Sequence, residues 1–266
     1  MGDSPGSPYA AWLDGERARR QETLTFPEIR RALQALSEDY TSRRGRLARG
    51  AAFSGEGKRA AYALYYAPTH FVLTRAVLDS LGGTGAALRE IVDLGCGTGA
   101  CAAAWGLACA PPAPALLGID RDARMLEDAR RGWRELGLRG TTRRAGAGAG
   151  RLPGRGSGVL AGWSVNELPP EARERLLDGI LDAAGRGALI LVLEPVARGP
   201  SAAWWRAWER AFLPEGGRVD EWRFPASLLP PETMALGRAA GLDPRYLTAR
   251  SLALGFPAGI TGRPPK

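Results

Sequence analysis

Cysteine and long apolar stretches are both scarce in this sequence, and their absence excludes several kinds of protein. The three cysteines, Cys96, Cys101 and Cys109, match no common spacing of zinc or iron–sulfur ligands, so no metal site is predicted. No uninterrupted apolar run approaches the roughly 20 residues that a membrane-spanning helix needs. The first 20 residues contain no apolar core of the signal-peptide kind. We therefore expect a cytoplasmic protein that keeps its thiols reduced and contacts no membrane.

Lysine is almost missing as well, since Lys58 and Lys266 are the only two lysines among the 36 basic residues. The other 34 are arginines, and the abundance of alanine, glycine and proline beside them indicates a GC-rich coding bias. The net charge of +8 is local, because eight arginines stand against one glutamate between residues 130 and 155. Such a cluster attracts phosphate groups. We favour the simpler interpretation, a solvated edge of the domain.

Residues 1–84 are predicted to form an N-terminal helical extension that acts as a lid. The first 24 residues are polar and rich in glycine, proline and arginine, and no helix is expected there. Thr25 is typical of a helix N-cap, with Pro27 in the first turn. Apolar residues then repeat at helical spacing, at Ile29, Leu33, Leu36 and Tyr40. Two more helices are expected over residues 58–66 and 69–81, separated by Pro68.

Residues 85–266 show strands that alternate with helices. Short buried strands are expected at residues 90–94, 115–120, 159–165, 188–194 and about 246–254. Helical segments separate most of them, and this alternation is typical of a parallel sheet with helices on both faces. The fold class predicted for residues 85–266 is therefore a doubly wound, Rossmann-like α/β domain.

The first of these strands runs directly into a glycine-rich turn, Asp93-Leu94-Gly95-Cys96-Gly97-Thr98-Gly99, which opens into a helix. Glycine lets the backbone curl tightly and approach a ligand, because it has no Cβ. The next strand ends at Asp120, which lies 23 residues beyond Gly97. This is close to the offset of about 20 residues at which a carboxylate accepts hydrogen bonds from ribose hydroxyls. Together these features predict a nucleotide pocket.

The spacing of the glycines distinguishes two kinds of nucleotide pocket. Dehydrogenases that bind NAD use G-x-G-x-x-G, whereas this turn is G-C-G-T-G with Asp93 two residues ahead. It resembles the first motif of the class I S-adenosylmethionine-dependent methyltransferases. The resemblance implies a seven-stranded sheet and S-adenosyl-L-methionine as co-substrate, with the glycines beneath its methionine part and Asp93 at its amino group. The cofactor-binding residues predicted on this basis are Asp93, Gly95, Gly97, Gly99, Asp120, Arg121 and Asn166.

One feature departs from this family, whose members often carry an acidic residue after the third strand that meets the adenine amino group. Residues 141–146, at the corresponding place, contain none.

Polar residues follow the strands expected at residues 159–165 and 188–194, at the rim where a parallel sheet binds ligands. Asn166 and Glu167 follow one strand, and Glu194 ends the other. In the extension, His70 is the only histidine and would accept a proton, while Tyr66 and its neighbours would face a sulfonium cation. The predicted catalytic residues are thus Asn166, Glu167, His70 and Tyr66. The alternatives are that Glu167 caps the next helix, that His70 joins two helices, and that the tyrosines belong to the core.

A narrower resemblance rests on the motifs around the glycine turn, which are Pro68-Thr69-His70-Phe71, Asn166-Glu167-Leu168-Pro169 and Leu193-Glu194-Pro195. In this order they resemble the methyltransferase-like proteins of the mitochondrial small ribosomal subunit. Their bacterial class I relatives resemble the chain more closely still, over residues 60–255. The mitochondrial members bind an iron–sulfur cluster through cysteines that this chain lacks.

The function predicted from these patterns is a class I methyltransferase that acts on a small-molecule acceptor. Two alternatives stay open. In the first, the chain is a ribosome-associated, RNA-binding assembly factor or an rRNA methyltransferase-like protein, with the arginines of residues 130–155 on phosphates. In the second, the enzyme consumes S-adenosylmethionine without methylating, for example by cyclising its aminobutyrate arm. The sequence specifies neither the acceptor nor an oligomeric state.

Overall fold

A computed structural model describes residues 7–42, 55–148, 150–196 and 203–257. By its internal contacts the chain divides into two units. Unit 1 comprises Met1–Val72 and Pro225–Leu247, and unit 2 comprises Leu73–Phe224 and Thr248–Lys266. Within the described ranges, no helix combines the length and the apolar character needed to cross a bilayer.

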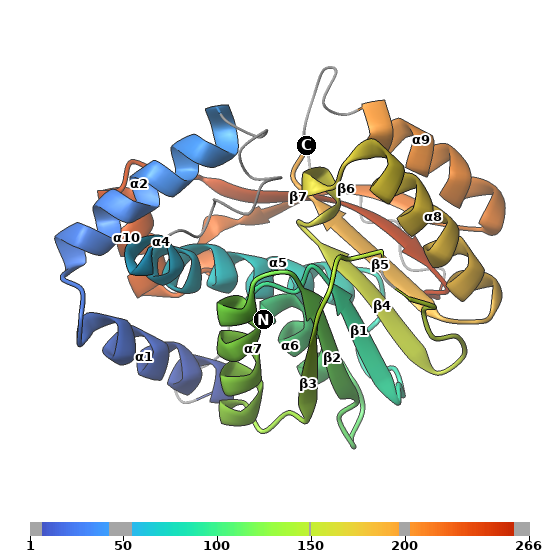
Figure 1. The fold of residues 1–266 in the computed structure, drawn as a ribbon, viewed down its shortest axis with the longest axis horizontal. Helices are drawn as coiled ribbons and strands as arrows, with labels where there is room; N and C mark the ends of the chain where they lie inside the picture. Colours follow the sequence, from blue (N-terminus) through green and yellow to red (C-terminus); the bar gives the residue numbers. More distant parts are fainter. Residues whose placement is uncertain (1–6, 43–54, 149, 197–202, 258–266) are drawn as a thin grey trace. The chain divides into compact units, whose positions relative to one another are not determined.

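Seven strands form one sheet, in the order β3-β2-β1-β4-β5-β7-β6 (Figure 1). Strands β1 to β5 pair in parallel, and β7 runs antiparallel to β5. The bounds are Glu90–Leu94 for β1, Ala115–Asp120 for β2, Gly140–Arg144 for β3, Ser157–Gly162 for β4, Leu189–Glu194 for β5, Arg218–Pro225 for β6 and Tyr246–Leu254 for β7. The predicted seven-stranded α/β sheet is confirmed. Strand β6 was not predicted, because Trp222 is its only buried residue and its sequence lacks an apolar run.

Helices cover both faces of the sheet, as a doubly wound fold requires. Val92, Val159 and Ile190 pack on one face in a core shared with α8 (Pro170–Gly185) and α9 (Ala203–Phe212). The next residues along the strands point to the other face, which carries α6 (Ala100–Ala108) and α7 (Ala123–Glu135). Glycines in β4 let α6 approach closely, because a Cβ on Gly162 would lie 2.8 Å from the Sγ of Cys101.

Unit 1 begins with a helix where none was expected. Helix α1 spans Pro8–Gln21, and the hydroxyl of Ser7 accepts the N–H of Ala10 at 3.1 Å as its N-cap. The polar composition of residues 1–24 hides a short apolar stripe, since Tyr9, Trp12 and Leu13 are buried at helical spacing. The expectation of an unstructured segment is therefore wrong for residues 8–21.

Helix α2 (Phe26–Ser42) follows the predicted pattern. The N–H of Thr25 donates to the carboxylate of Glu28 at 2.7 Å, which satisfies a backbone group at the helix start. Ile29, Leu33 and Leu36 are fully buried, so the apolar stripe faces the core of unit 1. The predicted N-cap and buried face are confirmed.

The predicted interruption at Pro68 is wrong. Helix α4 (Glu56–Ala61) leads into the π-helical turn η1 (Tyr62–Tyr66), which continues without a break into α5 (Ala67–Ser80). Pro68 comes directly after the π turn, at the second residue of α5. A π turn shifts the hydrogen-bond ladder by one residue, which accommodates the missing N–H of proline without ending the helix.

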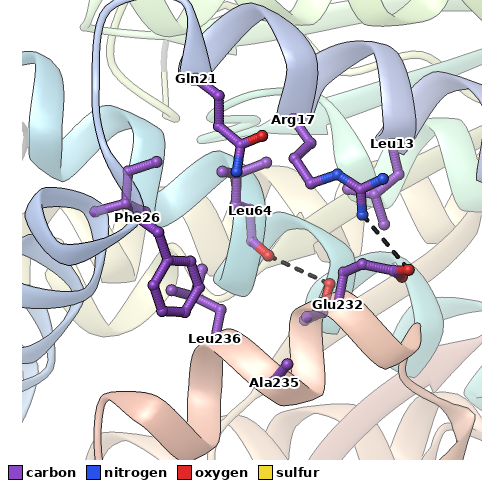
Figure 2. Close-up of a pocket in the computed structure, with 10 residues that line it drawn as sticks. Leu13, Arg17, Gln21, Phe26, Leu64, Glu232, Ala235 and Leu236 are labelled. Atoms are coloured by element: carbon purple, nitrogen blue, oxygen red, sulfur yellow. Dashed lines mark hydrogen bonds and ion pairs between the residues drawn. The ribbon is translucent and has the colours of Figure 1, made fainter.

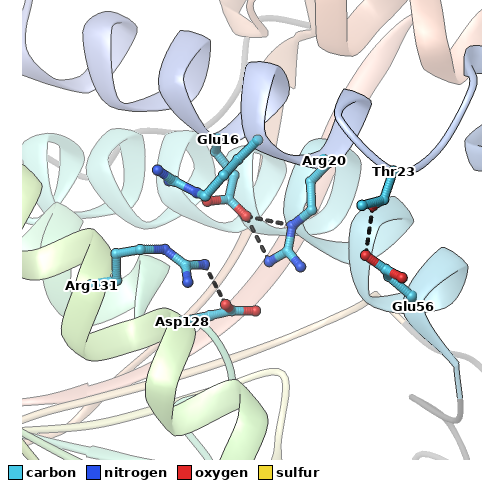
Figure 3. A network of polar contacts seen from close by, with 7 residues as sticks. Glu16, Arg20, Thr23, Glu56, Asp128 and Arg131 are labelled. Atoms are coloured by element: carbon cyan, nitrogen blue, oxygen red, sulfur yellow. Dashed lines mark hydrogen bonds and ion pairs between the residues drawn. The ribbon is translucent and has the colours of Figure 1, made fainter.

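Salt bridges within α1 neutralise the buried Glu16, and one hydrogen bond connects the segment after α1 to α4 (Figure 3). The carboxylate of Glu16 is 3% exposed and bonds to Arg19 at 2.8 Å and to Arg20 at 2.6 Å. The hydroxyl of Thr23 donates to Glu56 at 2.7 Å, which connects the end of α1 to the start of α4. Two arginines neutralise Glu16, so its burial carries no isolated charge.

Residues 225–247 belong to unit 1, although the sequence pattern groups them with the methyltransferase domain. Their helix α10 (Pro231–Ala239) packs against η1, where the hydroxyl of Thr233 donates to the carbonyl of Leu64 at 3.3 Å. Gly237 lies so close to Tyr65 that a Cβ would be 2.6 Å from its ring. These contacts join segments about 170 residues apart, which local patterns do not reveal. The lid role of the extension stays a prediction.

Candidate functional site

The glycine turn after β1 has a backbone that only glycine adopts easily. Gly95, Gly97 and Gly99 have φ angles of 74°, 52° and 74°, in the left-handed region. The N–H of Gly95 donates to the carbonyl of Ile119 at 2.8 Å, which fastens the turn to the end of β2. The carbonyl of Gly99 accepts from the indole of Trp133 at 2.8 Å. The turn is therefore held from two sides before it enters α6.

Asp93 lies buried behind this turn and is 1% exposed. Its carboxylate accepts the N–H of Ala102, in the first turn of α6, at 3.2 Å. Burial and, to a smaller extent, the nearby Asp120 raise the pKa of Asp93 to about 7, against the lowering effect of the hydrogen bond from Ala102. A buried carboxylate of this kind is stabilised by a cation placed beside it. An amino group is a suitable partner.

Asp120, at the end of β2, supports the same turn. One of its carboxylate oxygens accepts the N–H of Gly97 at 2.9 Å, and the other accepts the N–H of Asp122 at 2.9 Å. Each oxygen has a second lone pair, so both can still accept from a ligand hydroxyl. Arg121 follows on the exposed surface. The structure thus brings Asp93, the three glycines and Asp120 together, as the sequence predicts.

Thr98 is a residue of this turn that the sequence analysis did not single out. Its hydroxyl is buried, and among the described residues it has no hydrogen-bond partner. A buried hydroxyl without a partner is costly, so Thr98 is a candidate contact for a bound ligand. Its place between two glycines of the motif was the available signal.

The turn after β4 meets the turn after β1. The hydroxyl of Ser164 donates to the carbonyl of Leu94 at 2.6 Å, and a Cβ on Gly95 would lie 2.4 Å from the Cβ of Ser164. Just before it, Trp163 has a φ of 54°, which is rare for a bulky residue and costs roughly 1–3 kcal/mol. Strain of this kind gathers at functional sites. Next comes the short helix η2 (Val165–Glu167), which carries Asn166 and Glu167.

Glu194, at the end of β5, holds η2 in place. One oxygen of this fully buried carboxylate accepts the N–H of Asn166 at 3.0 Å, and the N–H of Val165 also donates to it. The second oxygen has no hydrogen-bond partner among the described residues. Across the strand pair, Glu194 is in register with Arg250, whose charge favours the ionised carboxylate. Burial outweighs these contacts and raises the pKa of Glu194 to about 8.

The side chain of Asn166 is also fixed, because its carbonyl oxygen accepts from the indole of Trp204 at 3.1 Å. Two guanidinium groups lie over the Trp204 ring, those of Arg173 at 5.4 Å and Arg250 at 5.7 Å from its centre. Contacts of this kind contribute up to about 2 kcal/mol when desolvated. The amide N–H groups of Asn166 are left to donate to a ligand. Asn166 is therefore oriented by Glu194 and Trp204 together.

Glu167 titrates near neutrality. Burial and, to a smaller extent, Asp120 raise the pKa of its carboxyl to about 7, against the lowering effect of Arg121. The alternative that Glu167 caps the next helix is wrong, because α8 begins after Pro169 with no side-chain hydrogen bond at its cap. A carboxyl with this pKa exchanges protons readily at pH 7, which suits a general acid or base.

Tyr66 and His70 both lie in unit 1, within one aromatic cluster. Their ring centres are 6.2 Å apart, and the ring of Tyr40 stands edge-on to Tyr66 at 5.0 Å. Burial lowers the pKa of His70 to about 3, so its imidazole is neutral at physiological pH. Tyr66 shares a hydrogen bond with Ser37. The two residues are brought together, and their roles towards an acceptor stay predictions.

Exchanging Glu194 for glutamine should flatten the pH dependence of stability. The folded state holds the pKa of Glu194 at about 8, above its ordinary 4.5. The contribution of the protonated carboxyl to the free energy of unfolding is therefore complete below pH 4.5 and is lost as the pH rises through 8. Glutamine keeps the acceptor for Asn166 but carries no charge. Urea denaturation at pH 6 and pH 8.5 should therefore show Glu194→Gln gaining stability relative to the wild type at the higher pH.

The matched control is Glu221→Gln, an exposed carboxylate on β6. This control should change the free energy of unfolding by the same amount at pH 6 and at pH 8.5. An identical pH slope for Glu194→Gln and the wild type would show that Glu194 is not buried as described.

Comparisons with known proteins are limited to distant structures. No protein-family model matches the sequence, and no curated protein matches it. A putative RNA methyltransferase from Pyrococcus horikoshii has a TM-score of 0.43 and 13% identity, over 76% of this chain and 86% of its own. The [4+2]-cyclase SpnF has a TM-score of 0.46 and 18% identity, over 69% and 80%. A methyltransferase from Thiobacillus denitrificans, bound to S-adenosyl-L-homocysteine, has a TM-score of 0.44 and 14% identity, over 70% and 91%.

At identities and TM-scores of this size, function has to be argued from the site itself. The narrower resemblance to proteins of the mitochondrial small ribosomal subunit is not confirmed by these matches and stays a prediction.

Proposed function

We propose that the chain is a class I methyltransferase that uses S-adenosyl-L-methionine as co-substrate. The observation that carries this proposal is the pair of carboxylates on either side of the glycine turn. Asp93 is buried behind the turn with a raised pKa, and Asp120 bonds to Gly97 at its outer side. A ligand with an ammonium at one end and ribose hydroxyls at the other matches this pair.

The residues present fit that ligand. Asp93 would hold the amino group, Asp120 the ribose hydroxyls, and the unpartnered hydroxyl of Thr98 a further polar atom. When bound, S-adenosylmethionine supplies an activated methyl group on a sulfonium. The protein's own part is to orient the acceptor and to manage its proton, since good positioning lowers a barrier by up to about 7–11 kcal/mol. We assign the orientation of the acceptor to Asn166 and the removal of its proton to Glu167.

A small molecule is the better acceptor on electrostatic grounds. Five of the eight arginines between residues 130 and 155 lie on α7 or β3, at the edge of the sheet, and β2 and β1 stand between them and β4. Some of these arginines are already engaged, Arg131 with Asp128 and Arg144 with the carbonyl of Arg121. At the ends of β4 and β5, Glu167 lies near Arg121, and Glu194 lies near Arg173 and Arg250, which gives no continuous positive track for a phosphate backbone.

The affinity for S-adenosyl-L-homocysteine should rise with pH between 6 and 8. Below its pKa of about 7, Asp93 must release a proton to pair with the ammonium, so affinity falls by up to about tenfold per pH unit. Calorimetric titrations at pH 6, 7 and 8 measure this slope. Asp93→Asn should bind weakly and without the slope.

Glu167→Gln is the matched control for that slope, because its carboxyl also titrates near pH 7. It should keep the pH dependence if Asp93 is the cause. A slope that disappears in Glu167→Gln and persists in Asp93→Asn would reverse the assignment of the two carboxyls.

The proposed function itself is tested with the purified protein. Calorimetry with S-adenosyl-L-homocysteine tests the pocket, and mass spectrometry of the native protein identifies co-purified small molecules. Incubation of a metabolite extract with methyl-labelled S-adenosylmethionine then tests transfer. Label in a small molecule supports the proposal. Label in RNA, or consumption of the co-substrate with the methyl retained, supports one of the two alternatives.

A further inference from the structure

A separate cavity is formed by residues of unit 1 alone, and Figure 2 shows it. Its volume is about 220 Å³. Helices α1, α2 and α10 and the turn η1 contribute its walls. The apolar side chains that line it are Leu13, Phe26, Ile29, Leu64, Ala235 and Leu236.

Polar groups are confined to the mouth of this cavity. Arg17 and Glu232 approach each other at 3.5 Å, and their side chains are 34% and 54% exposed. Gln21, one turn after Arg17 on α1, also lines the cavity and is exposed. The one polar side chain of the wall, Thr233, already donates to the carbonyl of Leu64. The interior therefore offers no hydrogen bond, while the mouth offers an amide and an ion pair.

Phe26 at the edge of the cavity is a second sign of a ligand. Phe26 is 45% exposed, and among the aromatic residues of the described part of the chain only Tyr246, at 39%, is exposed to a similar degree. Figure 2 shows the ring between the start of α2 and Leu236 of α10. An exposed aromatic ring on an apolar pocket gains by covering that surface with a ligand.

We propose that unit 1 binds an uncharged, largely apolar compound of one or two fused rings, whose single hydrogen-bonding group is directed to the mouth. The size follows from the volume, because an apolar cavity of about 150 Å³ stays dry and binds benzene. A cavity of about 220 Å³ is large enough for a bicyclic ring and too small for a helix of a partner protein. Since every lining residue belongs to unit 1, this inference does not depend on the proposed methyltransferase function.

The test uses the full chain and two neutral ring compounds with the same number of heavy atoms, indole and the more polar nicotinamide. Calorimetry should give a Kd for indole below about 1 mM and at least tenfold weaker binding of nicotinamide. Ala235 is an exposed residue that lines the cavity, so Ala235→Trp should fill it and weaken indole binding at least tenfold. Ala239→Trp, an exposed change one turn along the same helix and outside the lining, should leave the affinity within twofold.

A second variant, Phe26→Ala, keeps the test independent of how the tryptophan is tolerated. It removes the exposed ring and should weaken indole binding as well. Circular dichroism checks the fold of each variant. Equal indole affinity in wild type and Ala235→Trp, or equal affinity for indole and nicotinamide, overturns the proposal. So does a dimer that Ala235→Trp dissociates, because a second copy of the chain would then cover the cavity.

Discussion

Asp120→Ala should lower the affinity for S-adenosyl-L-homocysteine by roughly ten- to over a hundred-fold while the protein remains folded. The estimate rests on hydrogen bonds to a charged group, which contribute about 1.5–3 kcal/mol. Asp120 has a second role, because one of its oxygens accepts the N–H of Gly97 at 2.9 Å. Its loss therefore removes both a ligand contact and a support of the glycine turn. Calorimetric titration measures the change.

Two further variants separate these contributions. Asp120→Asn keeps one carbonyl oxygen as an acceptor. Its affinity for S-adenosyl-L-homocysteine should therefore lie between those of the wild type and Asp120→Ala. Asp178→Ala removes an exposed carboxylate from α8 and should leave the affinity unchanged. Wild-type affinity in a folded Asp120→Ala protein would show that Asp120 does not contact the ligand.

Gly99→Ala should cost about 2–6 kcal/mol of unfolding free energy. The φ of Gly99 is +74°, where another residue is strained by about 1–3 kcal/mol. In addition, the new Cβ would lie 2.5 Å from the indole nitrogen of Trp133, and overpacking adds about 1–3 kcal/mol. Urea denaturation of the variant measures the sum.

Gly137→Ala is the matched control, since Gly137 has a φ of +71° and nothing within 4 Å of the added Cβ. It should cost only the backbone strain, about 1–2 kcal/mol. If both variants lose the same free energy, the close contact between the glycine turn and Trp133 does not exist.

The part of the site that the sequence predicted is the part that local geometry determines. A glycine turn between a buried strand and a helix needs left-handed backbone, and Gly95 and Gly99 adopt it. Asp120 could be placed beside the turn because neighbouring parallel strands end at the same edge of the sheet. For the same reason Asn166 was expected at the rim, and the turn after β4 does contact the turn after β1.

The rest depends on contacts between residues that are far apart in the sequence. The bond from Asn166 to Glu194 spans 28 residues and follows from the pairing of β4 with β5. The burial of Glu194 and its register with Arg250 depend on the antiparallel pairing of β7. Spacing along the chain contains none of this information. The polar composition of residues 8–21 also led to the wrong prediction for α1, because three buried apolar residues suffice to anchor a helix that is otherwise polar.

Unit 1 is made of two stretches that the chain supplies at different times, and this has a consequence for synthesis. Helix α10 contacts η1 and α2, yet residues 73–224 are translated between them. At about 5–20 residues per second, the ribosome releases α10 on the order of ten seconds after η1. During that interval the apolar surface around Leu64 and Tyr65 is without its final cover. The nascent chain thus has a defined period in which chaperones are expected to bind it, and it ends only when α10 emerges.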